Sequence, residues 1–103
     1  MFYLAFNKSD SFIGQVRFDI NQNNAVINIS IDKDFRGKHF AAPLIFTSSF
    51  RLLKEKQGLS AIAAFIRPQN IPSIKAFAKA GYIQSPDEIL NDERYLVYKL
   101  VRQ

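Results

Sequence analysis

The residues best suited to chemistry lie in the segment 34–41, which reads Asp-Phe-Arg-Gly-Lys-His-Phe-Ala. This segment joins a run that alternates like a β-strand to a run that is spaced like an α-helix. Backbone N–H groups at the start of a helix attract anions, and Arg36 and Lys38 add positive charge beside them. The segment therefore predicts an anion site, and a phosphate group is the anion that such loops favour.

A second segment, 67–73, reads Arg-Pro-Gln-Asn-Ile-Pro-Ser and is followed by a helical run that ends at Gly81 and Tyr82. Pro72 near the first helical position and Gly81 just after the last one match the usual preferences at helix ends. Taken by itself, Asn70 is typical of a turn residue that flanks a helix.

The elements that must position these two segments follow from the hydrophobic pattern. Strands are expected over 2–6, 13–20, 25–31, 60–66, 82–83 and 94–101, and helices over 41–56 and between Pro72 and Gly81. The first three strands form an antiparallel meander with a hairpin turn at 21–24. A strand, a helix and a further strand imply parallel pairing across the crossover. The chain is therefore predicted to be an α/β domain (α+β, mixed sheet).

The core is expected along three helical stripes. The first helix supplies two of them and the second helix supplies the third, with these members: Ala41, Ile45 and Leu52; Phe46, Phe50 and Leu53; Ile74, Phe77 and Ala78. In the strand before the first helix, the isoleucines at 27, 29 and 31 share one face.

Composition limits the classes of function. A chain of 103 residues with 48% hydrophobic residues predicts one globular domain over 1–103. The formal net charge of +5 favours an anionic partner, but charge alone does not choose among cofactor, nucleic acid and lipid. Because cysteine is absent, disulfides, thiolate metal sites and a cysteine nucleophile are excluded. One histidine and no carboxylate cluster predict no metal site.

Targeting signals are not evident in the sequence. No apolar stretch approaches the roughly 20 residues of a membrane span. The N-terminus lacks the basic start and apolar core of a secretory signal. We therefore expect a cytoplasmic protein.

Together, in this order and spacing, the two segments resemble the acyl-CoA-binding core of the GNAT (Gcn5-related) N-acetyltransferase superfamily. In that family a strand feeds a loop of the form Arg/Gln-x-x-Gly-x-Gly/Ala, which binds the coenzyme A pyrophosphate. Arg36 and Ala41 match this pattern, whereas His39 stands where the family has its middle glycine. Asn70, Ser73 and the closing Gly-Tyr are similar to the family's Asn-x-x-Ser/Ala and Gly-Phe/Tyr.

The resemblance implies that acetyl-CoA is the co-substrate and names the residues expected to contact it. They come from the end of a strand, the loop after it and the start of the second helix: Ile29, Ser30, Ile31, Arg36, Gly37, Lys38, His39, Phe40, Ala41, Ala42, Asn70, Ser73 and Phe77. Many family members carry, at the position of Phe77, a tyrosine that protonates the departing thiolate. The general acid is therefore unassigned, with Tyr82 or water as substitutes.

The implied activity is transfer of an acetyl group to a primary amine of a small molecule, with amino-sugar nucleotides as one acceptor class. A backbone N–H from the strand that ends at Ile31 would stabilise the oxyanion. The family domain usually begins with a strand and two helices, and this chain is expected to start at the second strand. A homodimer, formed through the apolar run Met1 to Phe6, or a larger parent protein would then complete the acceptor site.

Two other classes of function stay open. A non-catalytic GNAT-like module that binds acyl-CoA or a protein partner is favoured by His39, by Phe77 and by the missing first elements. Nucleic-acid binding is suggested by the positive charge and by ten Phe and four Tyr, although these aromatics fall mostly on the expected core stripes. The cations scatter over several elements, so we expect no nucleic-acid partner, and no membrane partner either: Arg17, Arg51, Lys54, Lys56, Lys75 and Lys79. A P-loop NTPase is excluded, because the Arg-Gly-Lys run lacks the earlier glycine and the following Ser/Thr.

Overall fold

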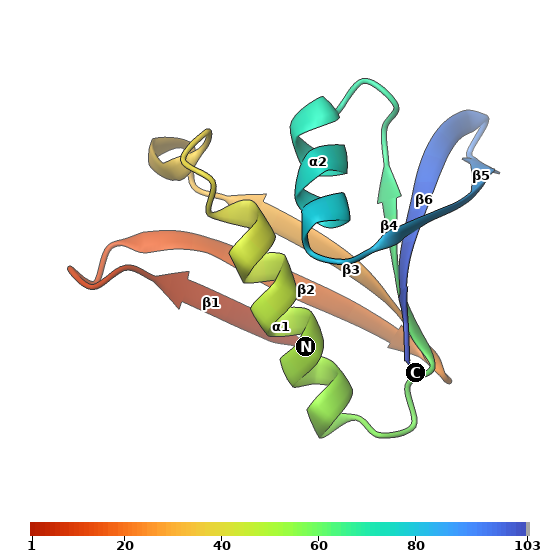
Figure 1. Cartoon of the computed structure of the whole chain (residues 1–103), viewed down its shortest axis with the longest axis horizontal. Helices are drawn as coiled ribbons and strands as arrows, with labels where there is room; N and C mark the ends of the chain where they lie inside the picture. Colours follow the sequence, from red (N-terminus) through yellow and green to blue (C-terminus); the bar gives the residue numbers. More distant parts are fainter. Residues whose placement is uncertain (103) are drawn as a thin grey trace.

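The computed structural model describes residues 1–102 as one mixed sheet with two helices on one of its faces (Figure 1). The strands follow the order β1-β2-β3-β4-β6-β5 across the sheet. The elements are β1 (Phe2–Phe6), β2 (Phe12–Asn21), β3 (Asn24–Ile31), a 3-10 turn (Lys33–Phe35), α1 (Ala41–Glu55), β4 (Ala61–Ile66), α2 (Ile71–Lys79), β5 (Ile83–Leu90) and β6 (Glu93–Val101). The predicted α/β class with a mixed sheet is confirmed.

The sheet consists of an antiparallel meander and a second group of strands, joined by one parallel pair. In the meander β1-β2-β3, the turn between β2 and β3 includes Gln22, whose φ of 56° is the left-handed conformation that tight hairpins need. β3 and β4 pair in parallel, as the strand-helix-strand crossover predicted. The pairing covers only three positions, from Asn24 opposite Ala61 to Val26 opposite Ala63. Beyond them the two strands diverge (Figure 1).

The hydrophobic core lies between the sheet and the two helices. α1 contributes Ile45 and Leu52, both completely buried, and α2 contributes Phe77. Two buried hydroxyls pair inside the core, with Ser49 Oγ 2.7 Å from the Tyr82 hydroxyl. A buried polar group costs little when it is paired in this way, so the core tolerates both hydroxyls.

The prediction that Phe46 and Phe50 lie in the core is wrong. Phe46 and Phe50 are 50% and 49% exposed and contact each other on the outside of α1, with ring centroids 4.6 Å apart. The buried face of α1 instead runs through Ser48 and Ser49, and the Ser48 hydroxyl donates to the Leu44 carbonyl at 2.7 Å. A serine that bonds its own helix backbone has no unpaired polar group, so it can replace an aromatic ring inside.

The second helix differs from expectation in the same way. Ala78 is exposed, whereas Ala76 and Ala80 pack on the core. α2 ends at Lys79, so its few turns leave room for one apolar stripe only. That stripe is centred on Ile74 and Phe77, as predicted.

The C-terminal hairpin is longer than the sequence predicted. Tyr82 is a buried residue before the strand, and β5 extends from Ile83 to Leu90. β5 is an edge strand whose side chains are mostly exposed, so it lacks the apolar alternation that marks a strand. Its pairing with β6 shifts between Ser85 and Glu88, and the turn is made by Asn91 and Asp92, with φ of 50° and 64°.

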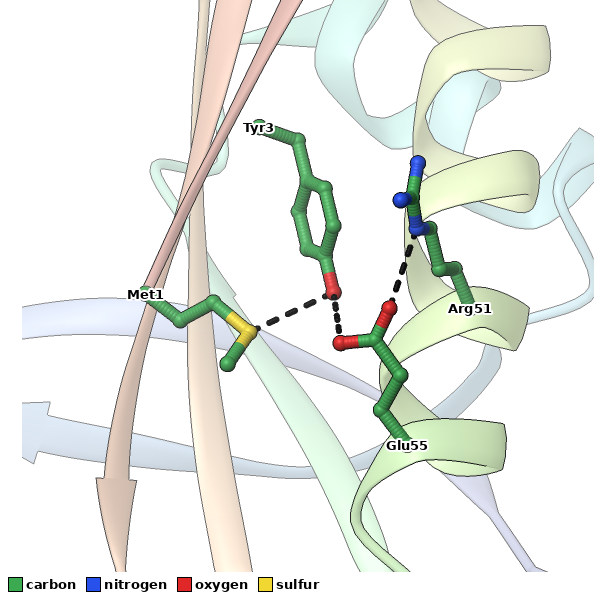
Figure 2. Close-up of polar contacts among 4 residues, drawn as sticks. All are labelled: Met1, Tyr3, Arg51 and Glu55. Atoms are coloured by element: carbon green, nitrogen blue, oxygen red, sulfur yellow. Dashed lines mark hydrogen bonds and ion pairs between the residues drawn. The ribbon is translucent and has the colours of Figure 1, made fainter.

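Hydrogen bonds between polar side chains link β1, the edge strand on the other side of the sheet, to α1 (Figure 2). The Tyr3 hydroxyl lies 3.3 Å from Glu55 Oε2 and 3.3 Å from the Met1 sulfur. Arg51 Nε donates to Glu55 Oε1 at 3.0 Å, and its guanidinium lies 5.4 Å from the centre of the Tyr3 ring. Burial and the Glu55 carboxylate raise the pKa of Tyr3, so the hydroxyl stays protonated as a donor.

Over residues 1–102, no helix combines the length and the apolar character needed to cross a membrane.

Candidate functional site

The divergence of β3 from β4 leaves backbone groups of β3 without a partner strand. The Asp32 N–H donates to the Ile13 carbonyl at 2.7 Å. This bond shows which β3 residues have their backbone N–H and C=O groups directed toward β2, because the direction alternates along the strand. Backbone groups of even-numbered β3 residues therefore face β2, and those of Ile29 and Ile31 face the β4 side. Both residues lie beyond the last β3-β4 pair, so their N–H groups point into the gap.

A cavity of about 720 Å³ lies where the two strands diverge, between the loop before α1 and the start of α2. It brings together the two segments that the sequence singled out, although residues 42–66 lie between them in the chain. The predicted residues that line it are Ile29, Ile31, Arg36, Gly37, His39, Phe40, Ala41, Ala42, Asn70 and Ser73.

Three predicted residues do not line the cavity: Ser30, Lys38 and Phe77. Ser30 directs its backbone toward β2, and strand alternation puts its side chain on the face opposite Ile29, which packs on the core. Lys38 is exposed, with its ammonium 5.8 Å from the centre of the Phe35 ring.

Phe77 is a core residue, only 2% exposed, and packs edge to face against Tyr82 at a centroid distance of 5.1 Å. An aromatic ring in that position contributes to stability through burial. Phe77 does not line the cavity, so the cavity gives no support to its expected contact with the coenzyme.

The loop before α1 has a backbone suited to an anion. Gly37 and His39 both have left-handed φ, 75° and 64°, and Phe40 returns to the right-handed helical region. Such alternation turns successive N–H groups toward one side. No side chain caps the start of α1 at Phe40, so the first N–H groups of the helix have no side-chain acceptor.

Arg36 connects this loop to the end of β3. Its Nε donates to the Ile31 carbonyl at 3.0 Å, which is one of the groups that face the gap. The guanidinium thereby replaces the missing strand partner and keeps its other N–H donors free. Arg36 both shapes the cavity and supplies positive charge to it.

The start of α2 is held by Asn70, whose Oδ1 accepts from the Ser73 N–H at 3.3 Å. This is an N-cap, so the interpretation of Asn70 as a helix-flanking residue is confirmed. The amide NH₂ remains a donor at the cavity wall, because the cap uses only the oxygen.

The cavity wall is cationic. Arg36, Lys75 and Lys79 line it, and no Asp or Glu of residues 1–102 does. Sequence reasoning missed the two lysines, because it counted them among scattered charges. The signal was present in the spacing of Ile71, Lys75 and Lys79, which repeats every four residues and so marks one face of a helix.

A general acid is not evident in the cavity. Tyr82, the substitute that the sequence suggested, is buried with its hydroxyl bonded to Ser49. Burial raises the pKa of Tyr82 well above its usual range. No tyrosine of the described chain lines the cavity, so the catalytic residues stay unassigned.

Comparison with known families identifies the class of protein. Residues 1–83 match the family described as an acetyltransferase (GNAT) domain. The chain therefore belongs to the GNAT acetyltransferase family. Comparison with curated protein sequences gave no match.

Solved structures of the same fold are similar along almost the whole chain. A chimera of the spermidine N-acetyltransferase SpeG from Vibrio cholerae and hSSAT is 17% identical, with a TM-score of 0.84 over 97% of this chain and 65% of its own. Ribosomal-protein-S5-alanine acetyltransferase from Vibrio fischeri is 18% identical, with a TM-score of 0.82 over 97% and 60%. Aminoglycoside acetyltransferase AAC(6')-Ib, in complex with coenzyme A and kanamycin, is 16% identical, with a TM-score of 0.84 over 98% and 66%. The chain spans roughly two thirds or less of the length of these proteins.

Proposed function

We propose that this protein is an acetyl-CoA-dependent N-acetyltransferase that acts on a primary amine of a small molecule. The observation that carries the proposal is the cationic cavity at the divergence of β3 and β4. Its wall offers backbone N–H groups, three cationic side chains and no carboxylate, which suits a phosphorylated ligand. Family membership supports the choice of acetyl-CoA as that ligand.

The residues present fit the coenzyme in two regions. The N–H groups of Ala41 and Ala42, with the loop at Gly37, would hold the pyrophosphate. The N–H groups of Ile29 and Ile31 would face the thioester end and stabilise negative charge on its carbonyl oxygen. The coenzyme supplies an acetyl thioester, whose carbonyl carbon would bond to a neutral amine nitrogen while the C–S bond breaks. The thiolate leaves, and the proton that the nitrogen loses goes to the thiolate or to water.

Proton transfer in this reaction does not require a side chain of the cavity. The thiol of the coenzyme has a pKa near ~8.5, so the thiolate is a tolerable leaving group near neutral pH. General-acid help is typically worth about 10² to 10⁴ in rate. Since no tyrosine lines the cavity, we expect turnover to be slower than in an enzyme with a tyrosine at the position of Phe77.

Calorimetric titration with acetyl-CoA tests cofactor binding. Asn70→Ser keeps an oxygen for the helix cap and removes the amide donors, so it should weaken binding without unfolding α2. Asn28→Ser, at a residue on the exposed face of β3, is the matched control and should bind like the wild type. Absence of saturable binding to the wild type contradicts the proposal.

Release of free thiol from acetyl-CoA, measured across an amine panel, tests catalysis. The panel contains spermidine, an aminoglycoside and an amino-sugar nucleotide, since the first two are named for structural neighbours and the third was implied by sequence resemblance. A single acceptor with saturable turnover supports the proposal and names the acceptor class.

A non-catalytic acyl-CoA-binding module is the second candidate. The burial of Phe77 and the absence of a tyrosine from the cavity wall favour it. Tight binding of acetyl-CoA without thiol release for any amine would select this alternative.

We further propose that β1 pairs with β1 of a second copy. The Phe18 N–H donates to the Met1 carbonyl at 2.8 Å, and the Met1 amine donates to the Phe18 carbonyl at 3.2 Å. Alternation then leaves the N–H and C=O groups of Phe2 and Leu4 on the free edge, where their side chains are 60% and 58% exposed. An uncharged edge of this kind favours strand pairing.

An antiparallel pairing centred on Leu4 is self-complementary, because it sets Phe2 of each copy opposite Phe6 of the other. Sedimentation of the wild type should show a dimer, and Leu4→Lys should be monomeric with the same thermal stability. Ile83→Lys, on the opposite edge strand, is the control that should stay dimeric. A monomeric wild type would overturn this pairing.

A further inference from the structure

Two lysines of α2 line the cavity together with the loop before α1. Lys75 and Lys79 lie one helical turn apart on α2 and both line the cavity. α2 lies beside the first turns of α1 (Figure 1). Within the described chain, neither lysine has a carboxylate within 4.0 Å. The pair is therefore free to bind an anionic group of a ligand.

The loop and the lysine pair present donors to the same cavity from two different elements. The loop presents backbone N–H groups and Arg36, whose Nε is already bonded to the Ile31 carbonyl. The lysines approach from a different element and present two mobile ammonium groups. A ligand with one anionic group would leave one of the two sets of donors unused.

The coenzyme has two anionic regions that differ in how the charge is distributed. Each phosphate of its pyrophosphate has one ester bond and one anhydride bond and carries about one negative charge, whereas its 3′-phosphate is a monoester with its charge on a single phosphate. A phosphomonoester carries about −1.5 to −2 near pH 7. Two ammonium groups match this concentrated charge, and the N–H groups of the loop match the pyrophosphate, whose charge is spread over two phosphates.

We propose that Lys75 and Lys79 bind the 3′-phosphate of coenzyme A and make the protein discriminate coenzyme A from 3′-dephospho-coenzyme A. This inference rests on the proposed function, because it concerns a second part of the same ligand. Since both lysines are exposed to solvent, their contribution is screened by salt. We expect coenzyme A to bind about tenfold more tightly than the dephospho form at low salt, which corresponds to about 1.4 kcal/mol.

Calorimetric titration of three proteins with both ligands tests this. The wild type should prefer coenzyme A, and the double variant Lys75→Ala, Lys79→Ala should bind both ligands with the affinity that the wild type has for the dephospho form. Alanine favours the helical state, so α2 should form in the variant, which circular dichroism checks. The control double variant Lys54→Ala, Lys56→Ala removes the same charge at residues that do not line the cavity, and it should keep the preference.

Each result has a distinct meaning. Equal affinity of the wild type for the two ligands would overturn the assignment of the lysines and leave the proposed function intact. Equal weakening of both ligands in the Lys75, Lys79 variant would also overturn it, because the lysines would then act on the pyrophosphate. Absence of binding to either ligand would contradict the proposed function itself and, with it, this inference.

Discussion

Replacement of Gly14 by alanine should deform the strand edge that faces the cavity. Gly14 lies in β2 opposite Ile31 of β3. A Cβ atom added there would lie 2.3 Å from the Ser30 carbonyl oxygen and 3.1 Å from the Ile31 Cα. Both neighbours are backbone atoms, so no side-chain rotation relieves the clash, and β3 must shift away from β2.

The size of the effect follows from this contact. A Cβ atom that close to an oxygen is about 1 Å inside ordinary contact distance, and overpacking of this kind typically costs about 1 to 3 kcal/mol. For a domain of this size, 1 kcal/mol corresponds to roughly 4 to 8 °C in Tm, so we expect a decrease on the order of 10 °C. A displacement of about 1 Å at Ile29 and Ile31 should also weaken acetyl-CoA binding by at least about tenfold.

Thermal unfolding and calorimetric titration of Gly14→Ala measure both quantities. Gly58→Ala is the matched control, because an added Cβ at Gly58 meets nothing within 4 Å. The control should keep wild-type affinity and gain roughly 0.4 to 1 kcal/mol from the stiffer unfolded chain. If Gly14→Ala retained the stability and affinity of the control, the close approach of β2 and β3 would have no role in shaping the site.

Further predictions concern the loop and the core. His39→Gly should leave acetyl-CoA affinity unchanged and raise Tm slightly, because the left-handed φ of 64° disfavours any side chain; a loss of affinity in titration would instead assign the imidazole a direct contact. Tyr82 is protonated in the fold with a pKa raised above its ordinary 10.0, so the unfolding free energy should fall above pH 10 by about 1.4 kcal/mol per pH unit for this group. Tyr82→Phe should remove that part of the alkaline slope in urea titrations; an unchanged slope would contradict the assignment. Arg102→Ala should lower the unfolding free energy by about 2 kcal/mol, because the Arg102 guanidinium donates to the Leu53 and Leu59 carbonyls, each at 2.7 Å. Urea denaturation measures this change, and an unchanged unfolding free energy would refute the prediction.

The elements around the site could be predicted because local patterns there agree with the fold. The alternation before Ile31 and the Pro and Gly that flank α2 depend only on near neighbours. The parallel pairing of β3 and β4 followed from a general rule of crossover connections. These features brought the two distant segments to one cavity.

Features that depend on tertiary context could not be predicted. Phe46 is exposed and Ser49 is buried because the rotation of α1 on the sheet, and the partner for a buried hydroxyl, are set by other elements. β5 has little apolar alternation, because an edge strand buries few side chains. Lys75 and Lys79 looked like ordinary solvated charges until the position of α2 relative to the loop was known.

The short pairing of β3 with β4 divides the sheet into two leaves joined by a narrow seam. One leaf contains β1, β2 and β3 under α1, and the other contains β4, β6 and β5 under α2. Within the described sheet only three residue pairs join β3 to β4, and outside it the packing of α1 on α2 and the Ser49–Tyr82 hydrogen bond connect the two leaves. The cavity lies at the open end of this seam, and its ligand contacts would come from both leaves. A ligand bound there would contact both leaves and so oppose their separation, by an amount that grows with its concentration relative to Kd.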